Sequence, residues 1–227
     1  MKHQLHRCLI VVLGTCFFFL SPSRAQDEFS DKINSNLGAI VNMPVGSTAR
    51  FANTGPGIVA GVGYNFSEHH AFVGEAMWTG LNLTGAAVQP LRAALQNNTL
   101  SGHSNLWSVT GNYRYQWQGK TVGVYGIGGG GWYYRTAGLS QKVTSGAGIS
   151  CLPAWPWWGF SCVSGTVTGN QQIANSNSST IGGNIGMGFT VKVADPSYRI
   201  YIEPRYHYAP TKNISTELVN ITVGIRY

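Results

Sequence analysis

The charged residues of this chain are few, and those that fall inside regular segments are the first candidates for chemistry. Charged residues make up only 10% of the 227 residues. Glu75 and Glu203 stand in segments where apolar and polar residues alternate, and so do Arg114, Arg205 and Arg226. A charge enclosed among apolar residues needs a partner, since an unpaired buried charge is strongly destabilising. We therefore predict interior ion pairs among these five residues. A gate or a proton path is the alternative use of the same groups.

Histidine is well suited to act as a base or a metal ligand, but its spacing here supports neither role. His69 and His70 are adjacent in the segment SEHH, and neighbouring residues of an extended chain point in opposite directions, which makes a poor chelate. His103 is followed directly by Ser104, and His207 falls in an alternating segment like the charged residues. We predict no metal site, no cofactor and no catalytic residue at these positions.

The elements that carry these residues are predicted to be β-strands. In the last eleven residues, ELVNITVGIRY, every second residue from Val219 to Tyr227 is apolar or aromatic, and the residues between them are polar or small. Alternation with a period of two indicates a strand with one apolar and one polar face. Alternating, strand-like segments are Asn36–Met43, Ile58–Phe66, Ala71–Thr79, Leu106–Trp117, Thr121–Arg135, Ile181–Val193, Tyr198–Ala209 and Glu217–Tyr227. Eight strands can close into a barrel, which leaves no exposed edge.

The connections between the predicted strands alternate between short and long. The short ones are Ser67–His70, Gln118–Lys120 and Ala194–Ser197, and the long ones are Pro44–Gly57, Gly80–Asn105, Thr136–Thr180 and Pro210–Thr216. Short turns at one rim and long loops at the other are typical of outer-membrane barrels. We also expect a short helical turn over Pro90–Gln96, and a bulge or kink at Gly128–Gly131, where the glycines hide the parity of the strand.

The two faces of the predicted strands differ in a way that indicates which one looks inward. In Leu106–Trp117 one face carries Trp107 and Tyr113, whereas the other carries Asn112 and Arg114. An eight-stranded lumen is just wide enough to be filled by side chains, so the small and polar face fits it and the ring-rich face is predicted to contact lipid. Rings also gather near both strand ends, as in the aromatic belts of membrane proteins. The alternative is that rings are simply common in strands.

The first 25 residues have the organisation of a secretory signal peptide. Lys2 and Arg7 form a basic start, Cys8–Leu20 is an apolar run, and small residues precede a cleavage point after Ala25. We therefore predict a signal peptide over residues 1–25 and a barrel domain over 26–227. The leader contains three of the 15 Lys and Arg residues. The excess of basic over acidic residues therefore does not indicate a nucleic-acid partner.

With these features the chain resembles the small eight-stranded outer-membrane β-barrel proteins of Gram-negative bacteria, the OmpA/OmpX-like superfamily. The resemblance is carried by the leader, the eight strands, GVGYNF at Gly61–Phe66, YGIGGGGWYY at Tyr125–Tyr134 and the aromatic C-terminus ITVGIRY. It implies an all-β, antiparallel, up-and-down transmembrane β-barrel in the bacterial outer membrane, with short periplasmic turns and long extracellular loops. It also implies that Tyr227 is the signal read by the barrel assembly machinery, and that the chain is a barrel-only member.

Two cysteines remain after the leader, Cys151 and Cys162, in the segment CLPAWPWWGFSC. In the oxidising envelope they are predicted to form a disulfide, which would restrict the unfolded chain by roughly 2–3 kcal/mol. The aromatic residues of the closed loop include Trp155, Trp157, Trp158 and Phe160. Exposed rings on a closed loop either form a surface recognition tip or fold over the barrel mouth, and both readings stay open.

Together these patterns predict a structural or surface-interaction protein, acting in membrane integrity, adhesion or ligand contact through its long loops, without enzyme activity. Its expected partners are outer-membrane lipid and lipopolysaccharide, the barrel assembly machinery and an unidentified surface ligand, and the protein is expected to be a monomer. A narrow channel or carrier for small or hydrophobic molecules is the alternative. A lipid A-modifying enzyme is a further one, but His207 is followed by Tyr208 and Ala209, which does not give the His-x-Ser pair of the deacylating barrels.

Overall fold

The structure, a computed structural model, describes residues 32–96, 98–154, 159–193, 198–211 and 215–227. Asn34–Tyr227 form one compact unit. The predicted signal peptide lies outside the described residues. Among the described residues, no helix is both long and apolar enough to cross a lipid bilayer.

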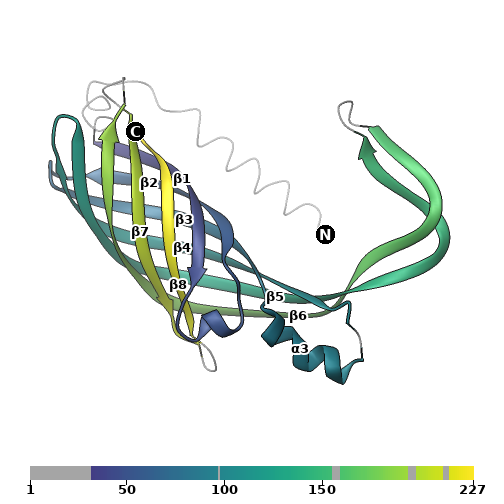
Figure 1. The fold of residues 1–227 in the computed structure, drawn as a ribbon. Helices are drawn as coiled ribbons and strands as arrows, with labels where there is room; N and C mark the ends of the chain where they lie inside the picture. The colour runs from purple at the N-terminus through teal and green to yellow at the C-terminus, as the bar shows by residue number, and fades with distance from the viewer. Residues whose placement is uncertain (1–31, 97, 155–158, 194–197, 212–214) are drawn as a thin grey trace, which may run out of the picture. The chain divides into compact units, whose positions relative to one another are not determined.

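Eight antiparallel strands follow one another around a closed ring, side by side in the order of the chain (Figure 1). The strands are β1 (Ile33–Pro44), β2 (Gly55–Asn65), β3 (His70–Asn82), β4 (Ser101–Gln118), β5 (Val122–Ala154), β6 (Gly159–Lys192), β7 (Arg199–Ala209) and β8 (Thr216–Arg226). The predicted all-β, up-and-down barrel of eight strands is confirmed.

The ring closes between its first and last strands. Asn36 of β1 faces Arg226 of β8 in an antiparallel register, and the terminal Tyr227 exchanges backbone hydrogen bonds with Ser35 at 2.9 and 3.0 Å. The β2–β3 and β4–β5 connections lie at one end of this ring, called the short-turn end. The β1–β2, β3–β4 and β7–β8 connections lie at the other, called the loop end.

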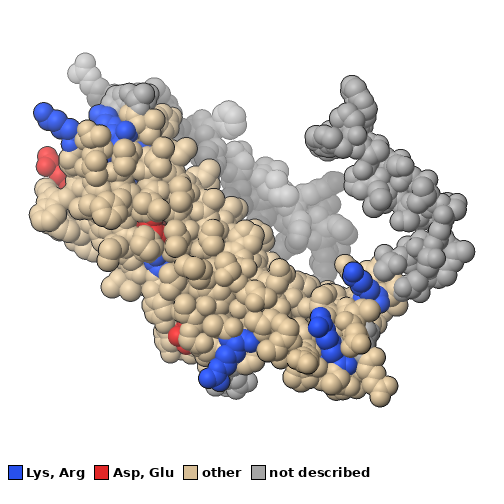
Figure 2. Space-filling model, in the orientation of Figure 1, with Lys and Arg blue, Asp and Glu red and all other residues tan. Residues whose placement is uncertain are grey.

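Side chains alternate between the outside and the inside of the ring. The outward face is apolar, and Leu37, Ile181 and Ile185 are each more than 60% exposed on it. The inward face carries mainly Asn, Thr, Gly and charged residues, and the five charged residues predicted to pair there are 6% exposed or less. Figure 2 shows a largely uncharged flank, with most Lys and Arg side chains towards its ends. This arrangement fits a barrel surrounded by lipid.

Aromatic side chains stand near both ends of the outward face. Phe66, Trp117 and Tyr227 belong to the short-turn end, Trp107 and Tyr208 lie nearer the loop end, and all five are exposed. Trp and Tyr rings favour the boundary between lipid and water, because one part of the ring is apolar and another forms hydrogen bonds. The positions of these rings fit two interfacial belts.

The longest predicted connection is largely strand rather than loop. Strands β5 and β6 stay paired from Val122 opposite Val191 as far as Ala154 opposite Gly159, so most of the predicted loop Thr136–Thr180 belongs to a two-stranded ribbon. The loop prediction was wrong because alternation shows a strand clearly only where one of its faces is apolar. The outer part of this ribbon is rich in Ser, Thr, Asn, Gln and Gly.

The glycine run of β5 is regular on both sides. Gly128–Gly131 pairs with β4 and with β6 without a shift in register, so the predicted bulge is wrong. A Cβ at Gly129 would lie 2.1 Å from the Gly111 carbonyl oxygen, and one at Gly131 would lie 2.0 Å from that of Val109. Close approach of the neighbouring strand, and not a break in pairing, requires glycine at these two positions.

Short helices occupy two connections of the loop end. They are the 3-10 helix η1 (Thr48–Arg50) and the α-helix α3 (Gly85–Ala94). Helix α3 begins earlier than the predicted turn Pro90–Gln96, because the Thr84 hydroxyl caps it by accepting a hydrogen bond from Ala87 N at 3.2 Å. Pro90 therefore lies inside the helix rather than at its start.

Heat-modifiable migration tests the closed barrel. In an outer-membrane fraction, the protein should migrate faster on SDS gels before boiling than after, because the paired ring resists detergent until it is heated. A variant truncated after Ser215 lacks β8, cannot close the ring, and should migrate at one position under both conditions. A single position for the full chain would contradict the closed ring.

Candidate functional site

A salt-bridge cluster occupies the middle of the lumen. Arg205 of β7 contacts Glu75 of β3 through Nη1, and contacts Glu203 of its own strand through Nη2 at 2.6 Å. All three side chains are buried. Alternation places Glu203 and Arg205 on the same inward face, and the ring brings Glu75 to Arg205 from 130 residues away in the chain. One guanidinium thus neutralises two carboxylates in part, so that each of these charges has a partner.

Amides and a phenol complete the hydrogen bonding of the two carboxylates. Glu75 accepts a hydrogen bond from Asn36 Nδ2 at 3.0 Å and another from Asn112 Nδ2 at 2.7 Å. Glu203 accepts one from the Tyr125 hydroxyl at 2.7 Å. The cluster therefore links side chains of β1, β3, β4, β5 and β7 across the lumen, and its carboxylate oxygens are bound by donors.

Arg114 and Arg226 also lie in the lumen, but neither forms a salt bridge with a described carboxylate. Arg114 Nη2 donates to Asn34 Oδ1 at 3.1 Å, and the Arg226 guanidinium lies 4.4 Å from the centre of the Tyr125 ring. Among the described residues, the ion pairs predicted for these two arginines are not seen. Alternation shows which residues point inward but not how far apart they lie in the lumen, and near the short-turn end an amide and a ring face replace the carboxylates.

Towards the loop end, apolar side chains fill the lumen. The apolar cluster consists of Ile40, Ala52, Val59, Met77, Leu81, Leu106, Tyr133, Ala209 and Leu218. Leu106 and Leu218 are no more than 1% exposed. A cavity of about 10 Å³ lies between this cluster and the salt bridges, which is room for about one water molecule. The described lumen is therefore packed with charged groups in its middle and with apolar groups between these and the loop end.

His207 is enclosed in the lumen and does not face lipid. It is 4% exposed, and its Nδ1 lies 2.9 Å from the Tyr133 hydroxyl. At the short-turn end, His70 contacts the Tyr113 hydroxyl through Nδ1, and its ring stacks on Phe66. Among the described residues, no group of three or more His, Cys, Asp or Glu side chains is arranged to hold a metal ion.

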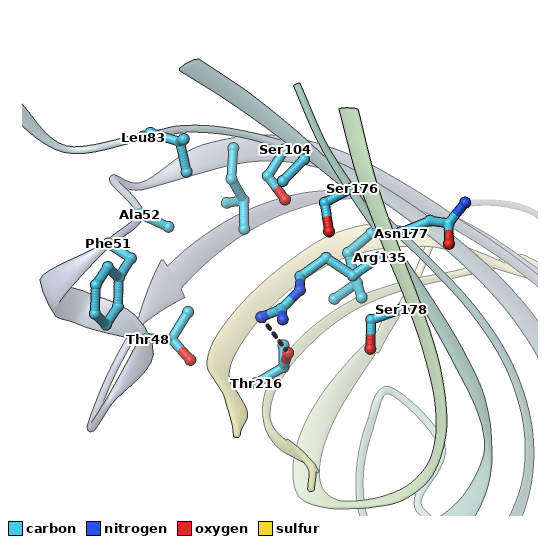
Figure 3. Close-up of a pocket in the computed structure, with 13 residues that line it drawn as sticks. Thr48, Phe51, Ala52, Leu83, Ser104, Arg135, Ser176, Asn177, Ser178 and Thr216 are labelled. Carbon is cyan, nitrogen blue, oxygen red and sulfur yellow. Dashed lines mark hydrogen bonds between the residues drawn. The ribbon is translucent and has the colours of Figure 1, made fainter. Parts of the chain in front are cut away.

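A pocket of about 210 Å³ lies at the loop end, next to the apolar cluster. Its lining is formed by Thr48, Phe51, Ala52, Leu81, Leu83, Ser104, Leu106, Arg135, Ala137, Ser176, Asn177, Ser178 and Thr216. Figure 3 shows Arg135 reaching into it, where Nη1 donates to Thr216 Oγ1 at 3.3 Å. The pocket combines an apolar wall with hydroxyls and one cation, and it is the candidate binding site.

The sites predicted in the long hairpin are described only in part. Cys151 and Cys162 face each other as partners in the β5–β6 register, and opposed residues of antiparallel strands have Cα atoms about 4.5–5.5 Å apart, a distance that a disulfide spans. Their side chains lie outside the described part, so the disulfide stays a prediction. The recognition tip stays one too, because Trp155, Trp157 and Trp158 and the side chain of Phe160 also lie outside it.

The predicted assembly signal, Tyr227, lies at the closing seam. Its ring is exposed, with its centre 5.2 Å from that of Tyr198. Its role as an assembly signal stays a prediction.

Sequence reasoning did not single out Tyr125, Tyr133 or Arg135, although all three point into the lumen. Tyr125 and Tyr133 are 5% and 1% exposed. The glycine run between them carries no side chains from which to read the parity of β5. Counting alternation straight through Gly128–Gly131 would have placed the three residues on one face with Ile127, because odd-numbered residues of this strand point inward.

No family model and no curated protein sequence matches the chain. Among solved structures, it is similar to a major outer membrane protein from Thermus thermophilus, with 10% identity, a TM-score of 0.50, and coverage of 86% of this chain and 98% of that chain. It is also similar to Ail, the attachment invasion locus protein of Yersinia pestis, with 13% identity, a TM-score of 0.49, and coverage of 86% and 97%. A third similar structure is Neisserial surface protein A, with 12% identity, a TM-score of 0.46, and coverage of 86% of this chain and 96% of that chain. The chain has the fold of bacterial outer-membrane β-barrel proteins, as its apolar exterior also indicates.

Removing the shared guanidinium should destabilise the barrel more than removing the whole cluster. The variant R205M leaves two buried carboxylates without their counter-charge, and we expect it to lower the free energy of unfolding by about 3–5 kcal/mol. The variant E75Q/E203Q/R205M has no charge in the cluster and should recover most of that loss. Urea unfolding in lipid vesicles measures both. Equal stability of R205M and the wild type would contradict the importance of the cluster.

Proposed function

We propose that the protein is a closed, non-conducting barrel of the bacterial outer membrane that acts at the cell surface by contact through its loop end. The observation that carries the proposal is the filled lumen. Arg205 holds Glu75 and Glu203 in its middle, and Leu106 and Leu218 are fully buried towards the loop end. A lumen of eight strands filled in this way leaves little room for a solute path, so function falls to the surfaces.

Two features of the loop end support a role in surface contact. The β5–β6 ribbon continues past Ser140, which is the last residue of β5 paired with β4. The pocket beside Arg135 combines polar and apolar walls. Long connections on a rigid scaffold are where binding residues concentrate. Adhesion or ligand contact, together with a structural role among outer-membrane lipid and lipopolysaccharide, follows as the proposed function, and no enzymatic step is part of it.

The two alternatives from the sequence find less support. A narrow channel would have to pass the salt-bridge cluster, where the neighbouring cavity measures about 10 Å³. A lipid-modifying enzyme would need its base at the lipid-facing surface, whereas His207 is buried in the lumen beside Tyr133.

Conductance tests the closed lumen. The wild-type protein in planar bilayers should show no unitary current steps, because the cluster and the apolar side chains block the path. The variant E75A/E203A/R205A removes the charged part of the block and should pass more current, and a general porin serves as the positive control. Regular steps from the wild-type protein would contradict the proposal and favour the channel.

Labelling of single cysteines tests which end faces the outside. Leu95 lies just after α3 at the loop end and is 55% exposed, and Lys120 lies in the β4–β5 turn at the short-turn end. A membrane-impermeant maleimide should label L95C in intact cells, but should label K120C only after the outer membrane is permeabilised. The parent chain reports the background from Cys151 and Cys162. The reverse pattern would place the loop end in the periplasm.

A further inference from the structure

We propose that the loop-end pocket binds a small anionic amphiphile, with Arg135 holding its carboxylate or phosphate head and the apolar wall holding its body. The inference names a ligand class for the surface contact proposed as the function, and it rests on that function. Three observations support it. The pocket is closed on its lumen side, Arg135 forms no salt bridge with a described carboxylate, and the apolar wall is of limited size.

The pocket is built by inward positions of neighbouring strands. Leu106 of β4 faces Arg135 of β5, and Leu81 of β3 faces Ser104 of β4. The next inward residue after Thr216 on β8 is Leu218, which belongs to the apolar cluster and is completely buried. The apolar cluster therefore closes the lumen side of the pocket, and a ligand enters from the loop end.

Arg135 brings a positive charge into this pocket, and no salt bridge joins it to a described carboxylate. Its described hydrogen bond is the one to Thr216 Oγ1 at 3.3 Å. Figure 3 shows the guanidinium between Thr48, Thr216 and Ser178. A guanidinium has five N–H donors, and their planar arrangement matches the two oxygens of a carboxylate or phosphate. Arg135 therefore has donors to offer an anion, unlike Arg205, which two carboxylates already occupy.

The side of the pocket opposite the guanidinium is apolar. Figure 3 shows Phe51, Ala52 and Leu83 along it. Leu81, and Leu106 beside Arg135 on the neighbouring strand, add two buried apolar side chains to the lining. The volume of about 210 Å³ is below the range of roughly 300–1,000 Å³ for drug-sized sites. The body of the ligand is therefore limited to a short alkyl chain or a single ring.

Head and body are both needed to match this site. An inorganic anion would use the guanidinium but leave the apolar wall uncovered. A neutral hydrocarbon would cover the wall but remove water from a charge without giving it a partner, which is costly. A cation would meet a like charge. The combination selects an amphiphile with one negative head.

Binding of four probes with the same six-carbon chain tests the proposal. Hexanoate, hexyl phosphate, 1-hexanol and hexylamine are titrated against the full-length protein in lipid nanodiscs and followed by saturation-transfer NMR, with empty nanodiscs correcting for partition into lipid. We expect saturable binding of hexanoate, hexyl phosphate or both, and binding of the alcohol and the amine weaker by at least about tenfold. The tighter of the two anions identifies the head group.

Three variants locate the bound probe. R135M removes the charge while keeping a long side chain, and should weaken anion binding by at least about tenfold. R50M is the matched control, because it removes an exposed arginine from η1, which also supplies Thr48 to the pocket. It should bind as the wild type does. A137F fills the pocket and should abolish binding. Heat-modifiable migration shows that each variant is folded, and R135Q replaces R135M if the latter does not fold.

Four results would overturn the proposal. They are no saturable binding of either anion to the wild type up to about 10 mM, unchanged binding by folded R135M, binding retained by folded A137F, and hexylamine binding as tightly as the anions. The proposed function fails separately. If the wild-type protein gives current steps but still binds hexanoate, the proposed non-conducting function is wrong and the binding site stands. If it neither conducts nor binds, only the binding site is wrong.

Discussion

The pairing of β1 with β8 is the constraint on which the other features of the barrel depend. Asn36 faces Arg226 across this seam, and Tyr227 is bonded to the backbone of Ser35. A bilayer offers no water to an open sheet edge, so closure satisfies the backbone groups of both terminal strands. It also decides the faces, because a slip of one residue would turn Arg226 towards lipid and Ile225 into the lumen. Closure therefore places the charged residues inside.

Inside the ring, the side chains change in character along the barrel. Arg114 and Arg226 lie nearest the short-turn end, the cluster around Arg205 occupies the middle, and apolar residues such as Leu106 and Leu218 follow towards the loop end. The charges gather where amides and a phenol can complete their hydrogen bonds. The apolar residues separate this polar network from the pocket at Arg135. The same packing that closes the lumen therefore gives the loop end a pocket with a floor.

Period-two alternation made much of this predictable. It assigned Glu75, Glu203 and Arg205 to the lumen and the rings of Trp107 and Tyr113 to the outside, because each strand buries one face and exposes the other. It failed in β5, where four glycines interrupt the pattern, and in the outer ribbon, where no apolar face marks the strands. It also missed the start of α3, where the cap at Thr84 and not Pro90 decides the helix.

The sequence by itself determined the class of fold, the number of strands and which face of most strands looks inward, since these follow from local alternation. Only the tertiary structure decided which interior groups meet. Arg205 rather than Arg114 pairs with Glu75, because partners across the lumen depend on the register and stagger of strands far apart in the chain. The same holds for the pocket, where Arg135, Thr216 and Phe51 come together from three separate parts of the chain.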